Sequence, residues 1–218
     1  MVIRWYGHAA FRLTTTQGVN IIIDPYESGG YGGAVSYNPV RDRADIVLIS
    51  HDHADHNCTG GIEGTYTDVR KEGKYDIRGI RIRAIPTFHD PSAGSERGRN
   101  LVFVIEADDM KVVHLGDLGH LLDRDAIKAI GRPDVLMLPV GGTYTIDADA
   151  ATKVMNDLGP SITLPMHYKT EKVGFPIAGV DDFTKGKQRV RTVDGAEIDV
   201  TREGMPKEPE IVLLRYAG

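Results

Sequence analysis

Apolar residues along the chain fall into short runs separated by turn residues, and this pattern predicts a strand-rich protein. Segment 80–85 alternates apolar residues with arginine, which indicates a strand with one buried and one wet face. The turns Arg78-Gly79 and Asp108-Asp109 predict hairpins. In this half of the chain, strands are expected at residues 2–6, 10–14, 19–23, 46–50, 65–69, 75–88 (interrupted by the first of these turns), 101–107 and 110–115.

The pattern then changes, and helices are expected between strands. The predicted helices are 123–130, 147–158 (closed by Gly159-Pro160) and 180–185, and the predicted strands are 135–138, 162–164, 188–193, 196–200 and 210–216. Segment 28–33 carries four glycines among six residues and predicts a loop, because no Lys-Ser/Thr follows it as in a phosphate-binding motif. No repeat or linker interrupts the chain, so we expect one domain over residues 1–218.

Composition excludes several classes of protein. Apolar residues make up 41% and charged residues 26%, which is typical of a globular chain and not of a disordered one. The net charge of -5 argues against a broad nucleic-acid surface. The single cysteine, Cys58, excludes an internal disulfide framework and suits a reducing compartment, so we expect a cytoplasmic protein. No apolar stretch is long enough to span a membrane.

The most informative stretch is residues 51–56, which directly follow the apolar run 46–49. It holds three of the eight histidines and two aspartates in the order His-Asp-His-Ala-Asp-His. Imidazole nitrogens and carboxylate oxygens are the ligands that zinc takes. The alternative is a polar loop whose histidines only cap and turn. Cys58, two residues beyond the stretch, is expected to be a small buried filler and not a ligand.

Metal-capable residues recur at the ends of predicted strands. Four predicted strands are each followed closely by one such residue, at positions 51, 89, 117 and 167. With the other histidines and Asp55 of the stretch 51–56, they make seven candidate ligands: His51, His53, Asp55, His56, His89, Asp117 and His167. One zinc takes at most four protein ligands, so seven argue for two divalent ions that share a bridging residue. A carboxylate with two oxygens, here Asp117, is suited to bridge. Zinc is the first expectation, with manganese and iron as alternatives.

At these residues the chain resembles hydrolases of the metallo-β-lactamase fold. His89, Gly116-Asp117 and His167 follow the His-x-His-x-Asp-His motif in that family's order. Segments 6–11, 139–145 and 165–168 resemble its small bacterial branch, which includes relatives of L-ascorbate-6-phosphate lactonase and of N-acyl-phosphatidylethanolamine phospholipase D. The fold that this resemblance implies is α/β (α+β), a four-layer αββα sandwich of the metallo-β-lactamase type.

The resemblance also implies roles for individual residues. It assigns one metal to His51, His53 and His89, the second to Asp55, His56 and His167, and the bridge to Asp117. It matches Asp24 to an aspartate that braces the histidine loop from behind the ligands. Asp55 is the candidate proton acceptor, so Asp55 and Asp117 are the catalytic candidates.

Other residues near the predicted strand ends compete for roles. His120, Tyr144 and Lys169 are candidate substrate contacts, each with the alternative of an ordinary surface or packing residue. His114 is expected to be a half-buried strand histidine, and His8 to have a structural or bracing role. Asp52 and Asp90 are expected to be loop residues.

The function expected from the sequence is hydrolysis of a small ester, lactone or phosphodiester by hydroxide bridged between two divalent ions. The alternatives are an iron-dependent redox enzyme on the same fold and a non-catalytic metal-binding module. The expected partner is a small-molecule substrate, not nucleic acid or a membrane. The sequence leaves open the substrate's identity, the metal and whether the chain forms a homo-oligomer.

Overall fold

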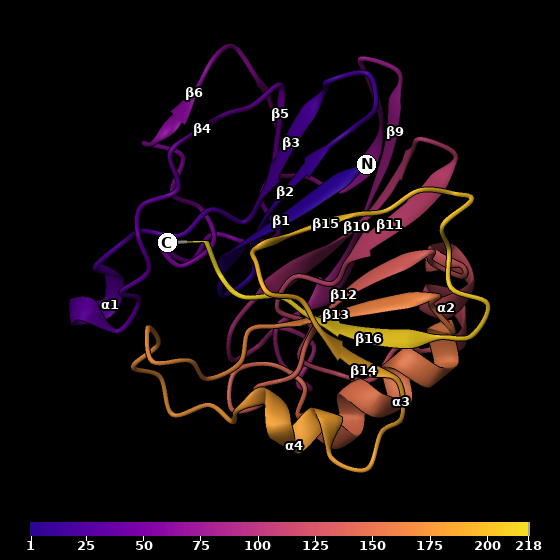
Figure 1. Cartoon of the computed structure of the whole chain (residues 1–218). Helices are drawn as coiled ribbons and strands as arrows, with labels where there is room; N and C mark the ends of the chain where they lie inside the picture. Colours follow the sequence, from indigo (N-terminus) through magenta and orange to yellow (C-terminus); the bar gives the residue numbers. More distant parts are fainter. Residues whose placement is uncertain (218) are drawn as a thin grey trace.

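Alternating apolar positions build two β-sheets that pack face to face in the computed structural model, which describes residues 1–217 (Figure 1). The first sheet has six strands in the order β15-β1-β2-β3-β5-β7. Their bounds are β1 (Val2–Gly7), β2 (Ala10–Thr14), β3 (Asn20–Ile23), β5 (Ile46–Leu48), β7 (Thr67–Val69) and β15 (Glu197–Asp199). β1, β2 and β3 are antiparallel neighbours, whereas β3, β5 and β7 are parallel.

The second sheet has eight strands in the order β14-β16-β13-β12-β11-β10-β9-β8. Their bounds are β8 (Gly73–Ile77), β9 (Ile80–Phe88), β10 (Arg99–Ala107), β11 (Met110–His114), β12 (Val135–Pro139), β13 (Ile162–Met166), β14 (Val190–Thr192) and β16 (Glu210–Leu213). The strands from β8 to β11 form antiparallel hairpins, and the pairs from β11 onward are parallel. The two-residue turns at 78–79 and 108–109 have positive φ throughout, as tight hairpins require.

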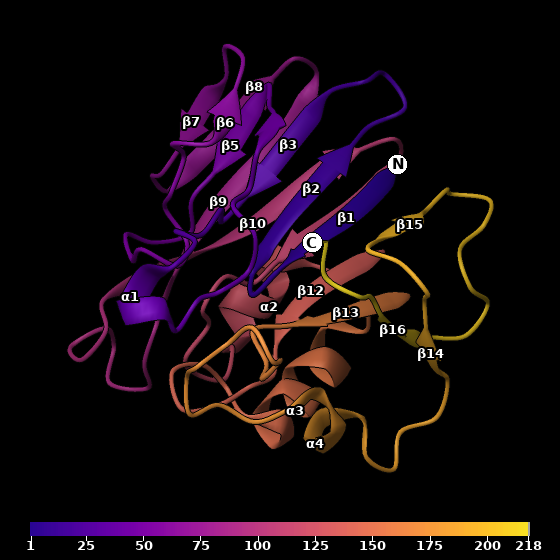
Figure 2. The same cartoon turned by 60° about the vertical axis from the view of Figure 1, so that its left-hand side comes forward.

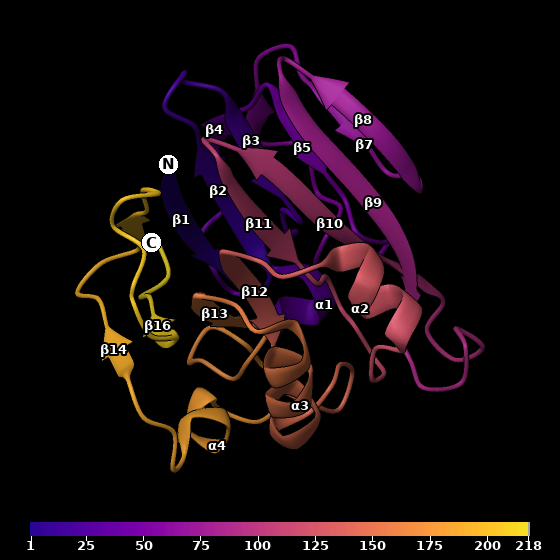
Figure 3. The ribbon, with the colours of Figure 1, turned by 90° about the vertical axis from the view of Figure 1, so that its right-hand side faces the viewer.

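Helices cover the outer face of the second sheet. α2 (Arg124–Ile130) lies beside β9, and α3 (Ala148–Leu158) contacts β12 and α4 (Val180–Thr184) (Figure 3). The Asp123 and Asp147 carboxylates accept backbone hydrogen bonds at the first turns of α2 and α3, which fixes where these helices begin. α3, the longest helix in the described part of the chain, has 11 residues, and none of the helices there could cross a membrane.

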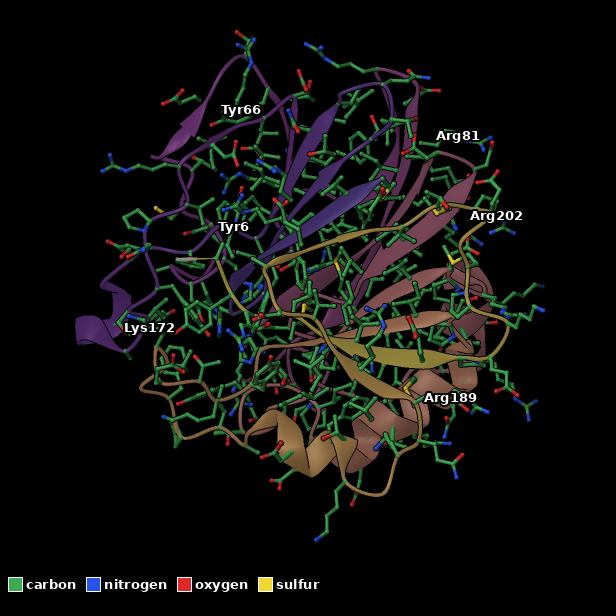
Figure 4. The ribbon with its side chains drawn as sticks, viewed as in Figure 1. Tyr6, Tyr66, Arg81, Lys172, Arg189 and Arg202 are labelled. Carbon is green, nitrogen blue, oxygen red and sulfur yellow. The ribbon has the colours of Figure 1, made fainter. Side chains whose placement is uncertain are left out.

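The middle strands of the first sheet, β3 and β5, are buried on both faces. Ile21 and Ile23 on β3 join the large core between the sheets, while Ile22 faces a second core. Tyr6, labelled in Figure 4, belongs to that second core together with Tyr37, and segment 26–44 contributes to it. The outer face of this sheet is therefore covered by loop and not by a long helix.

The predicted strands and helices are present with small shifts at their ends. The structure adds two short paired strands, β4 (Asp42–Arg43) and β6 (Ile62–Glu63), which are too short to predict from periodicity. The predicted loop at 28–33 contains a single turn, α1 (Gly30–Gly33), in which Tyr31 and Gly32 adopt left-handed φ. α1 lies beyond the carboxyl ends of β3 and β5 (Figure 2).

Strand direction brings the predicted ligands together. β9, β11 and β13 run the same way in the second sheet, because β9 and β11 both pair antiparallel with β10, and the pairs β11–β12 and β12–β13 are parallel. β3 and β5 are parallel in the first sheet. The loops that follow these strands meet at one end of the sandwich, where residues distant in the sequence form a single site.

Candidate metal centre

One group of candidate ligands consists of His51, His53 and His89, whose nearest ligand atoms all lie within 4.8 Å of one another. Two of the rings are held by their other nitrogen. His51 Nδ1 lies 2.9 Å from Ser50 Oγ, and His89 Nδ1 lies 3.0 Å from the carbonyl oxygen of Tyr144. Such contacts turn the remaining ring nitrogen towards the centre of the group.

The second group has four members: the three predicted ligands Asp55, His56 and His167, and in addition His8. His8 is fully buried, and its Nε2 lies 3.0 Å from Asp55 Oδ2. His8 and His167 both have positive φ, and their ring centroids are 4.0 Å apart. The bracing role expected for His8 agrees with its contact to Asp55, but its membership of the group was not expected.

Asp117 lies between the two groups. Its Oδ2 is 3.2 Å from His89 Nε2 in the first group, and 3.2 Å and 3.1 Å from the Nε2 atoms of His56 and His167 in the second. The Nε2 of His51 is more distant, at 3.9 Å. One oxygen of Asp117 therefore lies close to rings of both groups.

Asp24 lies behind the histidine loop. Its carboxylate accepts hydrogen bonds from the backbone N–H and the hydroxyl of Ser50, at 2.7 Å and 2.6 Å, and its Oδ2 lies 3.0 Å from His56 Nδ1. The residue is fully buried and has a φ of 47°, a left-handed conformation that a non-glycine residue seldom adopts. Asp24 thus joins the end of β5 to the ring of His56.

The electrostatics of the cluster depend on these pairs. Burial alone would raise the pKa of Asp117, but the neighbouring His167 and His56 hold it well below its usual value. Burial would lower the pKa of His56, yet Asp117 and Asp55 raise it well above its usual value. Burial lowers the pKa of His51 to about 3 and that of His8 to about 4. The cluster therefore combines carboxylates that stay charged with imidazoles of two kinds: those of His51 and His8 stay neutral, whereas that of His56 holds its proton more tightly and must release it to bind a metal.

Several buried polar atoms of the cluster have no hydrogen-bond partner within residues 1–217. They are His51 Nε2, His56 Nε2, His167 Nδ1, His8 Nδ1 and Asp117 Oδ1. His56 Nε2 is close to Asp117 but not in hydrogen-bonding geometry. Buried polar atoms are normally satisfied, and several of these belong to groups whose donor atoms gather within 4.8 Å. The nitrogen and oxygen donors fit divalent ions such as zinc.

A cavity of about 270 Å³ opens above these ligands. Tyr144, a candidate substrate contact, contributes to its wall. His120 and Lys169 do not. His120 Nε2 accepts a hydrogen bond from the backbone N–H of Phe88, and Lys169 Nζ donates one to the carbonyl of Phe175, so both side chains hold neighbouring loops.

Three further residues line the cavity that the sequence did not single out: Tyr31, Arg97 and Phe175. Phe175 packs edge-on against both Tyr31 and Tyr144, with centroids 5.5 Å and 5.7 Å apart. The sequence signal for Tyr31 was a lone aromatic residue within a run of glycines, and its side chain is 52% exposed. Burial and the nearby Asp55 carboxylate raise the pKa of the Tyr31 hydroxyl, which therefore keeps its proton.

The other residues considered in the sequence analysis do not line the cavity. His114 is fully buried, with Nε2 2.9 Å from the carbonyl of Ala9 and Nδ1 accepting from the N–H of Gly116. Asp52 is exposed and accepts a hydrogen bond from the side-chain amide of Asn57. Asp90 is buried, and its carboxylate accepts hydrogen bonds from backbone N–H groups of its own loop. Cys58 is half-buried and belongs to none of the ligand groups found in residues 1–217.

Comparison with known proteins identifies relatives across most of the chain. Residues 2–167 match the family model described as a beta-lactamase superfamily domain. A UPF0173 metal-dependent hydrolase from Thermoplasma acidophilum is 33% identical over 189 residues, covering 76% of this chain and 82% of the relative. A second, from Archaeoglobus fulgidus, is 30% identical over 216 residues, covering 85% of this chain and 90% of the relative.

A solved structure is similar over nearly the full length. It is the crystal structure of a Thermotoga maritima protein provisionally described as a Zn-dependent hydrolase of the metallo-β-lactamase superfamily. The two proteins are 35% identical, the match covers 99% of each chain, and the TM-score is 0.83. The two mixed sheets described above are thus those of a known fold.

Proposed function

The chain belongs to the metallo-β-lactamase superfamily and, within it, to the UPF0173 metal-dependent hydrolases, and we propose that it uses two divalent ions to cleave a small ester, lactone or phosphodiester. One observation carries the proposal: two groups of nitrogen and oxygen donors, buried except for the half-buried His53, lie on either side of Asp117 beneath an open cavity. The likeness of the sequence to lactonase and phospholipase D relatives favours the same kinds of scissile bond. Zinc is the metal that the donor set and the Thermotoga maritima relative favour.

In this proposal His51, His53 and His89 hold one ion, Asp55, His56 and His167 hold the other, and Asp117 contacts both. When bound, the ions acidify water and polarise the substrate oxygen that they contact. Asp55 accepts the proton released during attack, while His8 keeps its carboxylate in place through the 3.0 Å contact to Oδ2. Asp24 fixes the ring of His56.

The walls of the cavity position the substrate. The protonated Tyr31 hydroxyl is able to donate a hydrogen bond to a substrate oxygen. Tyr144 and Phe175 supply apolar surface beside it. The backbone carbonyl of Tyr144 also holds His89, so substrate contact and ligand placement share one loop.

The test combines metal analysis with hydrolysis assays. Protein purified without added metal is analysed for its elements and assayed with bis-p-nitrophenyl phosphate, p-nitrophenyl esters and lactones. We expect two equivalents of a divalent metal and hydrolysis of at least one substrate class. His53→Ala and Asp117→Ala should each lower kcat/KM by about 100-fold or more, because each removes a ligand. Asp182→Ala, on exposed α4, is the control.

Hydrolysis that persists unchanged in both ligand variants would refute the two-ion mechanism. Dominance of iron together with a visible absorbance band would instead favour redox chemistry on the same fold.

A further inference from the structure

A second and larger hollow adjoins the cavity above the ligands. Its volume is about 640 Å³, which is the size of a site for a small organic molecule. His53 and Arg97 line both hollows. A molecule with one end above the ligands can therefore extend past Arg97 into this second hollow, called here the basic groove.

The lining of the basic groove is cationic, although the chain as a whole carries a charge of -5. Its charged lining residues are the cations Arg70, Lys71, Arg97 and Arg99 and the acids Asp52 and Glu72. Arg70 is paired with Asp68 at 2.6 Å. Within residues 1–217, Lys71 and Arg99 have no carboxylate within 4.0 Å, so their charges are free for a ligand.

Arg97 is held in place by the fold. The buried Asp90 carboxylate accepts hydrogen bonds from four backbone N–H groups of its loop, including that of Arg97 at 2.8 Å. The Arg97 guanidinium lies over the ring of Tyr144, 5.8 Å from its centroid. Its one carboxylate neighbour in the described chain, Glu96, is 3.4 Å away and exposed. A guanidinium fixed at the junction of two hollows is suited to bind an oxyanion with two parallel hydrogen bonds.

We infer that the substrate is a small organic anion, with its scissile bond above the metal ligands and a phosphate or carboxylate group bound by Arg97 and Arg99 in the basic groove. The inference rests on the proposed function, because it names the substrate class of that site. The oxyanion is not the group that is cleaved. It anchors the substrate and distinguishes it from neutral esters or lactones of the same size.

The first test compares two esters of equal length with the same leaving group. p-Nitrophenyl pentanoate is neutral, and mono-p-nitrophenyl glutarate carries a terminal carboxylate in place of the methyl group. We expect the wild type to favour the glutarate ester in kcat/KM. The double variant Arg97→Gln/Arg99→Gln should reduce this preference about 10- to 100-fold, mainly through KM, because charged hydrogen bonds are lost. Its kcat/KM with the neutral ester should fall by less than its kcat/KM with the glutarate ester.

Two variants control this experiment. Arg97→Lys/Arg99→Lys keeps both charges and should restore part of the preference. Arg81→Gln removes an exposed arginine near the start of β9, at the other end of this strand from His89, and should behave as wild type (Figure 4). A wild type that prefers the neutral ester, or a glutamine variant that loses activity equally on both esters, would overturn the inference.

A binding measurement separates this inference from the proposed function. Calorimetric titration of the purified protein with inorganic phosphate and, separately, with glutarate measures oxyanion binding without hydrolysis. Arg97→Gln/Arg99→Gln should raise Kd about 10-fold or more for whichever anion binds, and the tighter anion identifies the chemical group. Affinities that do not differ between wild type and variant would refute the groove as an anion site. If neither these esters nor the phosphodiester and lactones named above are hydrolysed, the proposed function fails, and this measurement still decides the inference.

Discussion

Asp24 shows how one residue behind the ligands determines their geometry. Its two oxygens receive the backbone N–H and hydroxyl of Ser50 and face Nδ1 of His56. A carboxylate bound to one ring nitrogen fixes the tautomer and directs the other nitrogen towards a metal. Burial would raise the pKa of Asp24, but His56 lowers it below its usual value, so the residue stays charged.

Asp24→Asn is expected to weaken the ion held by His56 and leave the other in place. The amide keeps the shape of the side chain but replaces one acceptor oxygen with a donor group, which faces Ser50 or His56 unfavourably. Affinity for the second ion should fall about 10- to 100-fold. Metal-to-protein ratios after dialysis against a metal buffer measure this, with Asp52→Asn, on the loop that carries His56, as the control. Two tightly bound ions in Asp24→Asn would show that the brace is unnecessary.

At the scale of elements, the site requires loops from different strands to approach closely. Gly119 follows β11 and lies against His89, which follows β9. A Cβ on Gly119 would lie 2.2 Å from the carbonyl carbon of His89 and 2.3 Å from its oxygen. The N–H of Gly119 also donates to the carbonyl of Phe88 at 3.0 Å. The absence of a side chain at Gly119 thus lets the loops of Asp117 and His89 meet.

Gly119→Ala should therefore separate these loops. The contact is with backbone, which has little room to move, and overpacking of this kind costs about 1–3 kcal/mol. We expect a lower urea midpoint and loss of bound metal together. Gly60→Ala is the matched control, because a Cβ there meets nothing within 4 Å. A Gly119→Ala protein with full metal content would contradict this account of the loop contact.

The sequence predicts best those side chains that directly follow a strand. His51, His89, Asp117 and His167 lie within three residues of the ends of β5, β9, β11 and β13, so strand direction nearly fixes their positions. The turns of the hairpins and most strand bounds follow from local pattern in the same way. The sheet order and the pairing between distant strands do not, because they depend on contacts far apart in the sequence.

Residues on long loops were not predictable in this way. Arg97 and Phe175 reach the cavity only because tertiary hydrogen bonds shape their loops, such as that from Lys169 to the carbonyl of Phe175. His120 and Lys169 lie close to strand ends, yet their side chains bond to backbone and do not line the cavity. Nearness in sequence to a ligand therefore places the main chain but leaves the direction of the side chain undetermined.

At the scale of the whole molecule, burial of so many histidines makes the metal-free protein sensitive to acid. Burial lowers the pKa of His8 to about 4 and that of His51 to about 3, and it lowers the pKa of His114 as well. In the unfolded chain the same groups titrate near 6.5. Since their pKa values are lower in the folded state, the stability they contribute is present above about pH 6.5 and is lost as the pH falls.

The other titrating groups do not cancel this loss between about pH 6 and pH 4. His56 and His89 have raised pKa values, so below about pH 6 they are protonated in both states and contribute little slope. The buried carboxylates Asp24, Asp55 and Asp117 have lowered pKa values, and their contribution is lost only as the pH falls below about 4.

The free energy of unfolding of chelator-treated protein should therefore fall between about pH 6 and pH 4, by about 1.4 kcal/mol per pH unit for each histidine that only the unfolded chain protonates. Urea midpoints across this range measure the slope. His114→Gln removes one such histidine, which is not a candidate ligand, and should make the slope shallower. A midpoint independent of pH would mean that the buried imidazoles are protonated in the folded state. They would then be poor metal ligands, because a metal binds only the neutral ring.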